Sequence, residues 1–110
     1  MGAGQEKILE PDDPENEYSV ARLLANTLSD LGVTHVFGGH GGAIMNVIDA
    51  IVNHPKLEWV YIGCETNAPI AAGAYAKLRN GLGVCISSSG PGASHMLSGC
   101  LDCFQDGAPV

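Results

Sequence analysis

Three short segments of this chain combine residue types that could do chemistry: two glycine-rich loops and one isolated carboxylate. The glycine-rich segments are 38–42 (GGHGG) and 87–92 (SSSGPG), and each leads into a stretch with helical spacing. Such a turn presents backbone N–H groups and the positive end of a helix dipole to a ligand. The carboxylate is Glu65, which lies between an apolar run (WVYI) and an alanine-rich stretch.

Glu65 has two interpretations from its position alone. A carboxylate set between apolar segments would be partly desolvated and suited to proton exchange. Alternatively, Glu65 caps the N-terminus of the helix that follows, where the helix dipole favours a negative charge. Its position in the sequence does not decide between a functional carboxylate and a helix cap.

The glycine-rich loops lack the signatures of a nucleotide site. A G-x-G-x-x-G pattern read from Gly39 would require glycine at Ile44, and one read from Gly90 would require glycine at His95. A Walker A loop is also absent, because neither loop is followed by Gly-Lys-Ser or Gly-Lys-Thr. These loops therefore leave phosphate binding open without specifying it.

Other reactive residue types have simpler interpretations. His40 and His95 fall near the same loops, but with no third ligand evident we interpret them as loop histidines and expect no metal site. The serines at 87–89 lack a G-x-S-x-G pattern, which favours backbone capping over a nucleophile. Cys100 and Cys103 form a C-x-x-C within a helical apolar pattern, which favours small buried side chains over a redox or zinc site.

Hydrophobic periodicity predicts the elements that position these residues. Helical spacing indicates four helices, near 19–31, 44–51, 66–79 and 96–104. Ser19 and Thr66 are expected as N-caps, and Gly32 is expected to end the first helix. Runs rich in β-formers indicate strands at 33–37, 57–62 and 83–87, and residues 108–110 resemble the opening of a further strand.

This alternation predicts an α/β fold: a doubly wound parallel sheet of about three to four strands with helices on both faces. Ligands of open α/β sheets bind outside the carboxyl ends of the strands. The segments expected at those ends are 38–42, 63–66 and 87–92, which hold seven of the 15 glycines. The glycine excess is therefore expected at one edge of the sheet, together with Glu65.

Charge and composition argue against several classes of protein. Lys plus Arg number 5 against 12 Asp plus Glu, a net charge of −7, which disfavours a nucleic-acid groove or an anionic membrane surface. No apolar run is long enough to predict a membrane span. Residues 1–17 hold six of the acids and are expected to form an acidic mobile tail. Nothing in them is typical of a targeting signal, so a cytoplasmic location is expected.

At the loops described above, the sequence resembles a known family. It is similar over 18–110 to the N-terminal pyrimidine-binding domain of thiamine-diphosphate enzymes, and most similar to acetolactate synthases and related 2-oxo-acid decarboxylases and oxidases. Four motifs carry this resemblance in order: a glycine loop before G-A-I, a glutamate before an alanine-rich helix, S-G-P-G-A, and D-x-x-x-D-G-x-P. The combination is far more specific than any one motif.

The resemblance implies a catalytic role for Glu65. The matching glutamate of the family hydrogen-bonds the pyrimidine nitrogen of thiamine diphosphate and favours the imino tautomer, which removes the thiazolium C2 proton before attack on a 2-oxo acid. Carboligation or decarboxylation of 2-oxo acids is then the expected reaction. The resemblance also implies cofactor contacts at Gly39, His40, Gly41, Gly90, Pro91 and His95. His40 replaces a proline usual in relatives, and His95 replaces the asparagine of acetolactate synthases.

The resemblance further implies partners. The family's G-D-G…N segment, which holds the diphosphate through Mg²⁺, has no counterpart in this chain, so those metal ligands are expected on a diphosphate-binding domain of another chain or of a C-terminal region. Because the family's sites form between subunits, a homo-oligomer is expected. Residues 18–110 are thus expected to be a partial domain, inactive alone. The alternative is a non-catalytic truncated module that docks on a full-length homologue.

Overall fold

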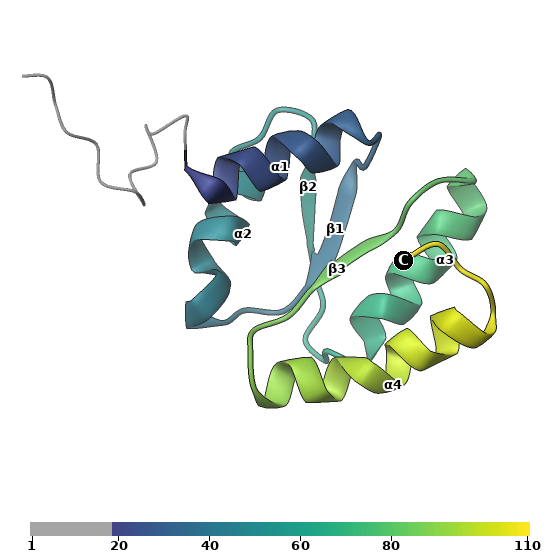
Figure 1. Ribbon diagram of the computed structural model, residues 1–110. Helices are drawn as coiled ribbons and strands as arrows, with labels where there is room; N and C mark the ends of the chain where they lie inside the picture. The colour runs from purple at the N-terminus through teal and green to yellow at the C-terminus, as the bar shows by residue number, and fades with distance from the viewer. Residues whose placement is uncertain (1–18) are drawn as a thin grey trace, which may run out of the picture.

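The computed structural model describes residues 19–110, so the predicted tail at 1–17 lies outside the described part (Figure 1). Within these described residues, four α-helices, one short 3₁₀ helix (η1) and three strands alternate. In order they are α1 (Val20–Asp30), β1 (His35–Gly38), η1 (Gly42–Ile44), α2 (Met45–Val52), β2 (Glu58–Tyr61), α3 (Asn67–Arg79), β3 (Val84–Ile86) and α4 (Pro91–Gln105). None of the helices in this part of the chain is long and apolar enough to cross a membrane.

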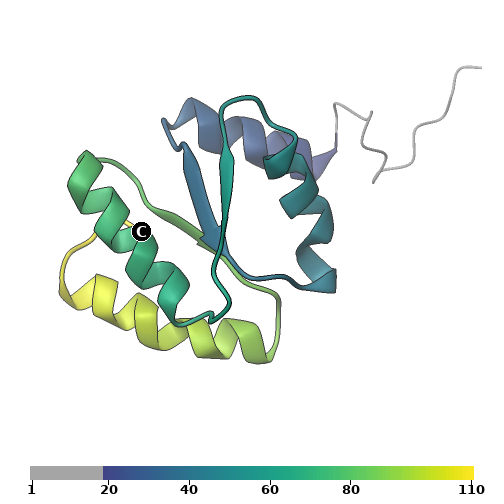
Figure 2. The ribbon, with the colours of Figure 1, turned by 180° about the vertical axis from the view of Figure 1, so that it is seen from behind.

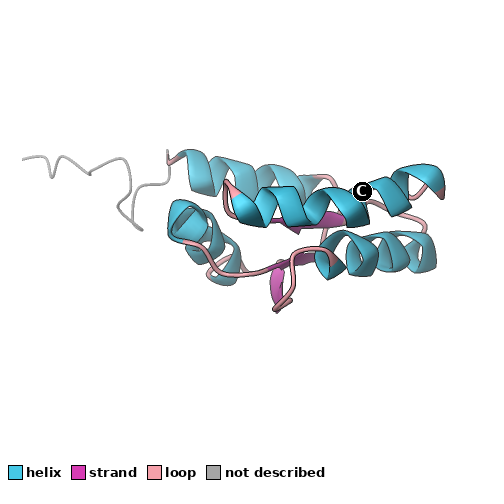
Figure 3. Cartoon of the chain, turned by 90° about the horizontal axis from the view of Figure 1, so that it is seen from below, coloured by secondary structure: helices cyan, strands magenta, loops and turns pink. Residues whose placement is uncertain are grey.

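The three strands form one parallel sheet in the order β2-β1-β3. β1 is central, and its Val36 stands opposite Trp59 of β2 and Val84 of β3. Because all strands run the same way, their carboxyl ends meet at one edge, which Figure 3 views from below. The structure confirms the predicted α/β class, with an incomplete sheet.

Helices cover both faces of the sheet. In Figure 1, α1 and α2 pack on one side of the strands and α3 and α4 on the other, and Figure 2 shows the same separation from behind. Adjacent residues of a strand point to opposite faces. Val36 accordingly packs with Ala25 and Ile51 beneath α1 and α2, whereas Phe37 packs with Ala68 and Ala72 of α3. The two small cores lie back to back across β1.

Two glycines bring α3 and α4 into close contact. A Cβ at Gly99 would lie 2.2 Å from the carbonyl oxygen of Thr66, and one at Gly73 would lie 2.7 Å from Sγ of Cys103. On the face of α3 that meets the sheet, Ala68 and Ala72 are fully buried. Small side chains therefore set the position of α3 against both its neighbours.

The ends of the elements partly follow the expected signals. Ser19 caps α1, because its hydroxyl accepts a hydrogen bond from the backbone N–H of Arg22 at 3.2 Å. Gly32 takes a left-handed φ of +82° after the helix ends. α4 begins at Pro91, because proline suits the first turn of a helix. The sequence placed the start five residues later, at Met96, because the small residues between them show no apolar periodicity. Residues 108–110 form no strand.

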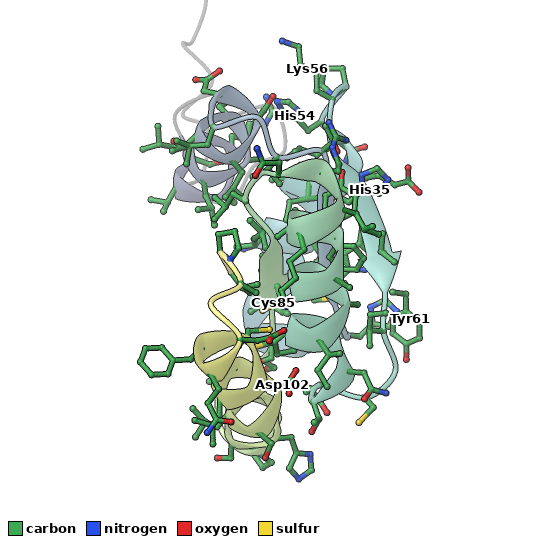
Figure 4. The ribbon with its side chains drawn as sticks, turned by 90° about the vertical axis from the view of Figure 1, so that its right-hand side faces the viewer. His35, His54, Lys56, Tyr61, Cys85 and Asp102 are labelled. Carbon is green, nitrogen blue, oxygen red and sulfur yellow. The ribbon has the colours of Figure 1, made fainter. Side chains whose placement is uncertain are left out.

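A polar network joins β1 to the last turns of α3 at the amino edge of the sheet. Nη1 of Arg79 donates hydrogen bonds to Oγ1 of Thr34 at 2.9 Å and to the hydroxyl of Tyr75 at 2.8 Å. That hydroxyl also contacts Nδ1 of His35 at 2.9 Å. Figure 4 shows His35 near the opposite end of the strands from Tyr61. The network therefore fixes the C-terminal end of α3, far from the glycine-rich loops.

Candidate functional site

The three loops at the carboxyl edge of the sheet contact one another in pairs. A Cβ at Gly41 would lie 2.3 Å from Cβ of Ser88, so the first and third loops touch backbone to side chain. Gly39 lies against the carbonyl oxygen of Ile62, to which an added Cβ would come within 3.3 Å. Glycine is thus needed at Gly41 for close approach between loops. This explains part of the glycine excess at this edge.

His40 and Tyr61 connect the first loop to the second strand. Their rings stack with centroids 4.7 Å apart and an interplanar angle of 23°. Tyr61 is the last residue of β2 and remains largely exposed, at the lower end of the sheet in Figure 4. The His40 ring therefore packs against the end of β2, an outer strand of the sheet. Within residues 19–110, no group of three or more His, Cys, Asp or Glu side chains could hold a metal ion.

Glu65 lies in the turn between β2 and α3, and its carboxylate faces the start of α4. Its side chain is 31% exposed, and Oε2 lies 3.7 Å from Nδ1 of His95. A Cβ at Gly92 would come within 3.3 Å of Oε1, so the glycine leaves room for the carboxylate. The second and third loops are joined by this contact. A half-buried acid therefore borders the place where the three loops meet.

The structure does not show Glu65 or Thr66 capping α3. Thr66 occupies the N-cap position as expected, but α3 has no side-chain capping hydrogen bond and no acidic residue in its first turn. Thr66 is thus the N-cap residue by position, but its hydroxyl makes no capping bond and donates instead to the backbone oxygen of His95 at 2.8 Å. Close packing of α4 against this turn supplies that alternative acceptor. The geometry leaves the carboxylate of Glu65 directed at α4 rather than at its own helix.

The remaining expected residues border the same edge. Gly90 has a left-handed φ of +79° and precedes α4, which Pro91 begins. Sequence reasoning missed Tyr61, and it placed Gly92 in the third loop without its contact to Glu65. Tyr61 carried one usable signal, because a residue that ends a strand of a parallel sheet lies at the ligand edge. The contact of Gly92 with Glu65 had no sequence signal, since it depends on how α4 packs.

Cys103 and Cys85 have the surroundings of small packed side chains. Cys103 is buried and its Sγ donates to the backbone oxygen of Pro69 at 3.1 Å, as expected for a small side chain on one helix face. Burial raises its pKa, with nearby Asp102 adding to the effect. Burial, together with Cys100 and Cys103, raises the pKa of Cys85 to about 11. Such thiols are poor nucleophiles, which disfavours a redox pair.

A surface hollow of about 210 Å³ lies between α3 and α4, away from the loops. Lys77 and Asp106 form an ion pair at its rim. Asp102, which also lines it, is labelled in Figure 4 beside α3. Glu65 does not line this hollow, which is therefore separate from the site described above.

Fold and site together define an α/β domain whose ligand edge is built from glycine-rich loops and one half-buried glutamate. A family model described as "Thiamine pyrophosphate enzyme, N-terminal TPP binding domain" matches residues 18–110. The chain belongs to this family, and thiamine pyrophosphate, also called thiamine diphosphate, is the cofactor that the family implies.

Curated relatives place the chain further within the family. It is 36% identical over 108 residues to an acetolactate synthase of Mycobacterium avium, which covers 98% of this chain and 17% of the relative. It is 35% identical over 96 residues to the acetolactate synthase large subunit of Lactococcus lactis, covering 87% and 17%. A pyruvate oxidase of Lactiplantibacillus plantarum is 36% identical over 88 residues, covering 79% and 15%. The chain is thus similar to the N-terminal domain of acetolactate synthase-like enzymes and spans about a sixth of their length.

Proposed function

We propose that this chain supplies the aminopyrimidine half of a thiamine-diphosphate site in an acetolactate synthase-like enzyme that acts on 2-oxo acids by carboligation or decarboxylation. The observation that carries the proposal is Glu65: a half-buried carboxylate at the ligand edge that does not cap its own helix. An acid in this position is what a ring nitrogen of an aminopyrimidine would need as a partner.

The surroundings of Glu65 fit a flat heterocycle. The first loop offers backbone without side chains at Gly39 and Gly41, and Gly41 packs directly on the Ser88 side chain. Gly39, Gly90 and Pro91 would line the ring, and His40 and His95 would border it. A flat ring held largely by glycine backbone and one carboxylate, with proline and histidine at its border, matches the residue types that these loops contain.

In this proposal each part has a distinct role. Thiamine diphosphate, when bound, supplies the carbon nucleophile that attacks a 2-oxo acid. Glu65 holds a proton on the pyrimidine ring, and exclusion of water by the loops strengthens that hydrogen bond. The diphosphate and its Mg²⁺ would be held by a partner domain, because residues 19–110 contain no cluster that could hold a metal ion. A homo-oligomer would bring such a domain to this edge.

The proposal is tested by cofactor binding with and without a diphosphate-binding domain from a relative. Calorimetry should detect thiamine diphosphate only in the mixture. In that mixture Glu65→Gln should slow exchange of the C2 proton by about 10²–10⁴-fold, the usual contribution of a positioned acid or base. An unchanged exchange rate would remove Glu65 from the role proposed for it.

A second candidate function is a non-catalytic module that docks on a full-length homologue. One observation favours it: α4 carries a row of exposed apolar side chains, Leu97, Leu101 and Phe104, on one face. The same calorimetry separates the two candidates. If the chain associates with a full-length relative and the complex binds no thiamine diphosphate at the interface that contains Glu65, the docking module is supported instead.

A further inference from the structure

Three sulfur-bearing side chains meet where α4 packs beside β3, an outer strand of the sheet. Sγ of Cys85 on β3 lies 3.9 Å from Sδ of Met96 on α4. Cys100 follows Met96 by four residues on the same face of α4, and its thiol is hydrogen-bonded to that of Cys85. Cys85 and Met96 also pack against the buried cluster around Phe37. Two thiols and one thioether thus share one partly buried spot, and Figure 4 labels Cys85 close to α4.

This combination of sulfur atoms is the ligand set of a soft metal ion. Thiolate and thioether ligands select Cu(I), whereas Zn²⁺ takes thiolate, imidazole and carboxylate ligands. Metal–sulfur bonds of about 2.3 Å put two sulfur ligands about 3.8–4.0 Å apart in tetrahedral or trigonal geometry. The 3.9 Å between Cys85 and Met96 lies in that range. Among the described residues no group of three His, Cys, Asp or Glu side chains could hold a metal ion, and here methionine supplies the third ligand.

The surroundings of the three sulfurs favour a bound cation. Burial first, and then the neighbouring thiols of Cys100 and Cys103, raises the pKa of Cys85 to about 11. A metal ion offsets this repulsion between neighbouring thiolates, because a coordinating thiol loses its proton to the bound charge. The spot is also accessible: Cys85 and Cys100 are each half-buried, and in the described residues no strand pairs with the outer edge of β3.

We propose that Cys85, Met96 and Cys100 form a three-coordinate site for one Cu(I) ion, which joins α4 to β3. The ion replaces one proton on each of the two thiols, both protons pass to solvent, and no electron is transferred. Cys103 is not a ligand, because its Sγ donates to the backbone oxygen of Pro69. None of the three ligands is among the residues assigned to thiamine diphosphate, so the site does not rest on the proposed function.

The test adds Cu(I) to the full chain without oxygen, in competition with the chelator bicinchoninate. The wild type should withdraw one Cu(I) per chain, and X-ray absorption at the copper edge should show three sulfur ligands at about 2.3 Å. Met96→Leu keeps both thiols and nearly the same apolar volume. It should weaken binding at least about tenfold, the loss typical even of a group that only supports a metal ligand. Cys64→Ser, the matched control, removes an exposed thiol outside the site and should bind as the wild type does.

Wild-type affinity in Met96→Leu, or lost binding in Cys64→Ser, would overturn the proposal, because thiols alone would then hold the metal. Cys100→Ser keeps the test decisive if Met96→Leu fails to fold, since position 100 is only half-buried. This variant should keep the helical circular dichroism of the wild type and lose the three-sulfur signal. Displacement of Cu(I) by an equal concentration of Zn²⁺ would also contradict the proposal, because a thioether is not a ligand that Zn²⁺ favours.

Discussion

Replacement of Gly99 by alanine should loosen the packing that holds the Glu65 turn against α4. The added Cβ would lie 2.2 Å from the carbonyl oxygen of Thr66 and 2.9 Å from Cγ of Pro69, whereas ordinary contacts begin near 3.4 Å. The nearest atom belongs to the backbone, so no side-chain rotation can relieve the clash. The turn and α4 must therefore separate by about 1 Å, the difference between the 2.2 Å approach to Thr66 and an ordinary contact.

The cost follows from two opposing effects. Overpacking of a close contact costs about 1–3 kcal/mol. Replacing a helical glycine by alanine returns about 0.5–1 kcal/mol of conformational entropy. The midpoints of these two ranges leave a net fall of about 1 kcal/mol in the free energy of unfolding, which lowers Tm by about 4–8 °C in a domain of this size. Thermal unfolding followed by circular dichroism measures the change.

Gly81→Ala is the matched control. Gly81 follows α3, has no atom within 4 Å of an added Cβ and does not adopt a left-handed φ. Its replacement should change stability by no more than about 0.5 kcal/mol. If Gly99→Ala unfolds at the temperature of the wild type and of Gly81→Ala, the close approach of α4 to the Glu65 turn does not hold the two together.

Three further perturbations test other contacts. Gly41→Ala should destabilise the chain by about 1–3 kcal/mol because its Cβ meets Ser88, and adding Ser88→Gly should restore much of the loss in urea denaturation. Thr66→Val removes the hydroxyl that donates to α4 and should cost about 0.5–1.5 kcal/mol by the same measurement; no loss would show that the bond is dispensable. The raised pKa of Cys85 favours the neutral thiol in the folded state, so stability should fall as pH rises from about 9 toward about 11, and Cys85→Ala should lack that fall. At pH 8, iodoacetamide should modify exposed Cys64 well before Cys85.

Local signals predicted the order of the elements well. The N-cap at Ser19 and the left-handed residue Gly32 depend only on neighbouring residues, and both are as expected. The start of α4 was placed too late, because small residues after Pro91 obscure a helix that proline favours. Residues 108–110 form a single backbone contact with Gly83 instead of a strand, since one hydrogen bond does not make a ladder.

The site was predictable only as a location. The carboxyl edge of the sheet follows from topology, so Glu65 and the glycine-rich loops could be placed together from the sequence. Whether Glu65 caps its own helix or leaves its carboxylate free depends on how α4 packs against the turn. Gly99 permits that packing, and the hydrophobic periodicity of the sequence does not reveal it. The stack of His40 on Tyr61 likewise joins the first loop to the end of β2, and this contact between segments distant in the sequence is a property of the folded sheet.

The polar network at Arg79 holds one end of α3, so that the helix can tilt about that end. Its C-terminal end is tied to Thr34, just before β1, and to His35 of β1 through Tyr75, whereas its other end carries the Glu65 turn. A helix of 13 residues is about 20 Å long, so a tilt of about 3° about the tied end moves the free end by about 1 Å. Under the proposed function, small rotations of α3 about the edge farthest from the loops would change the distance between the Glu65 carboxylate and the pyrimidine ring.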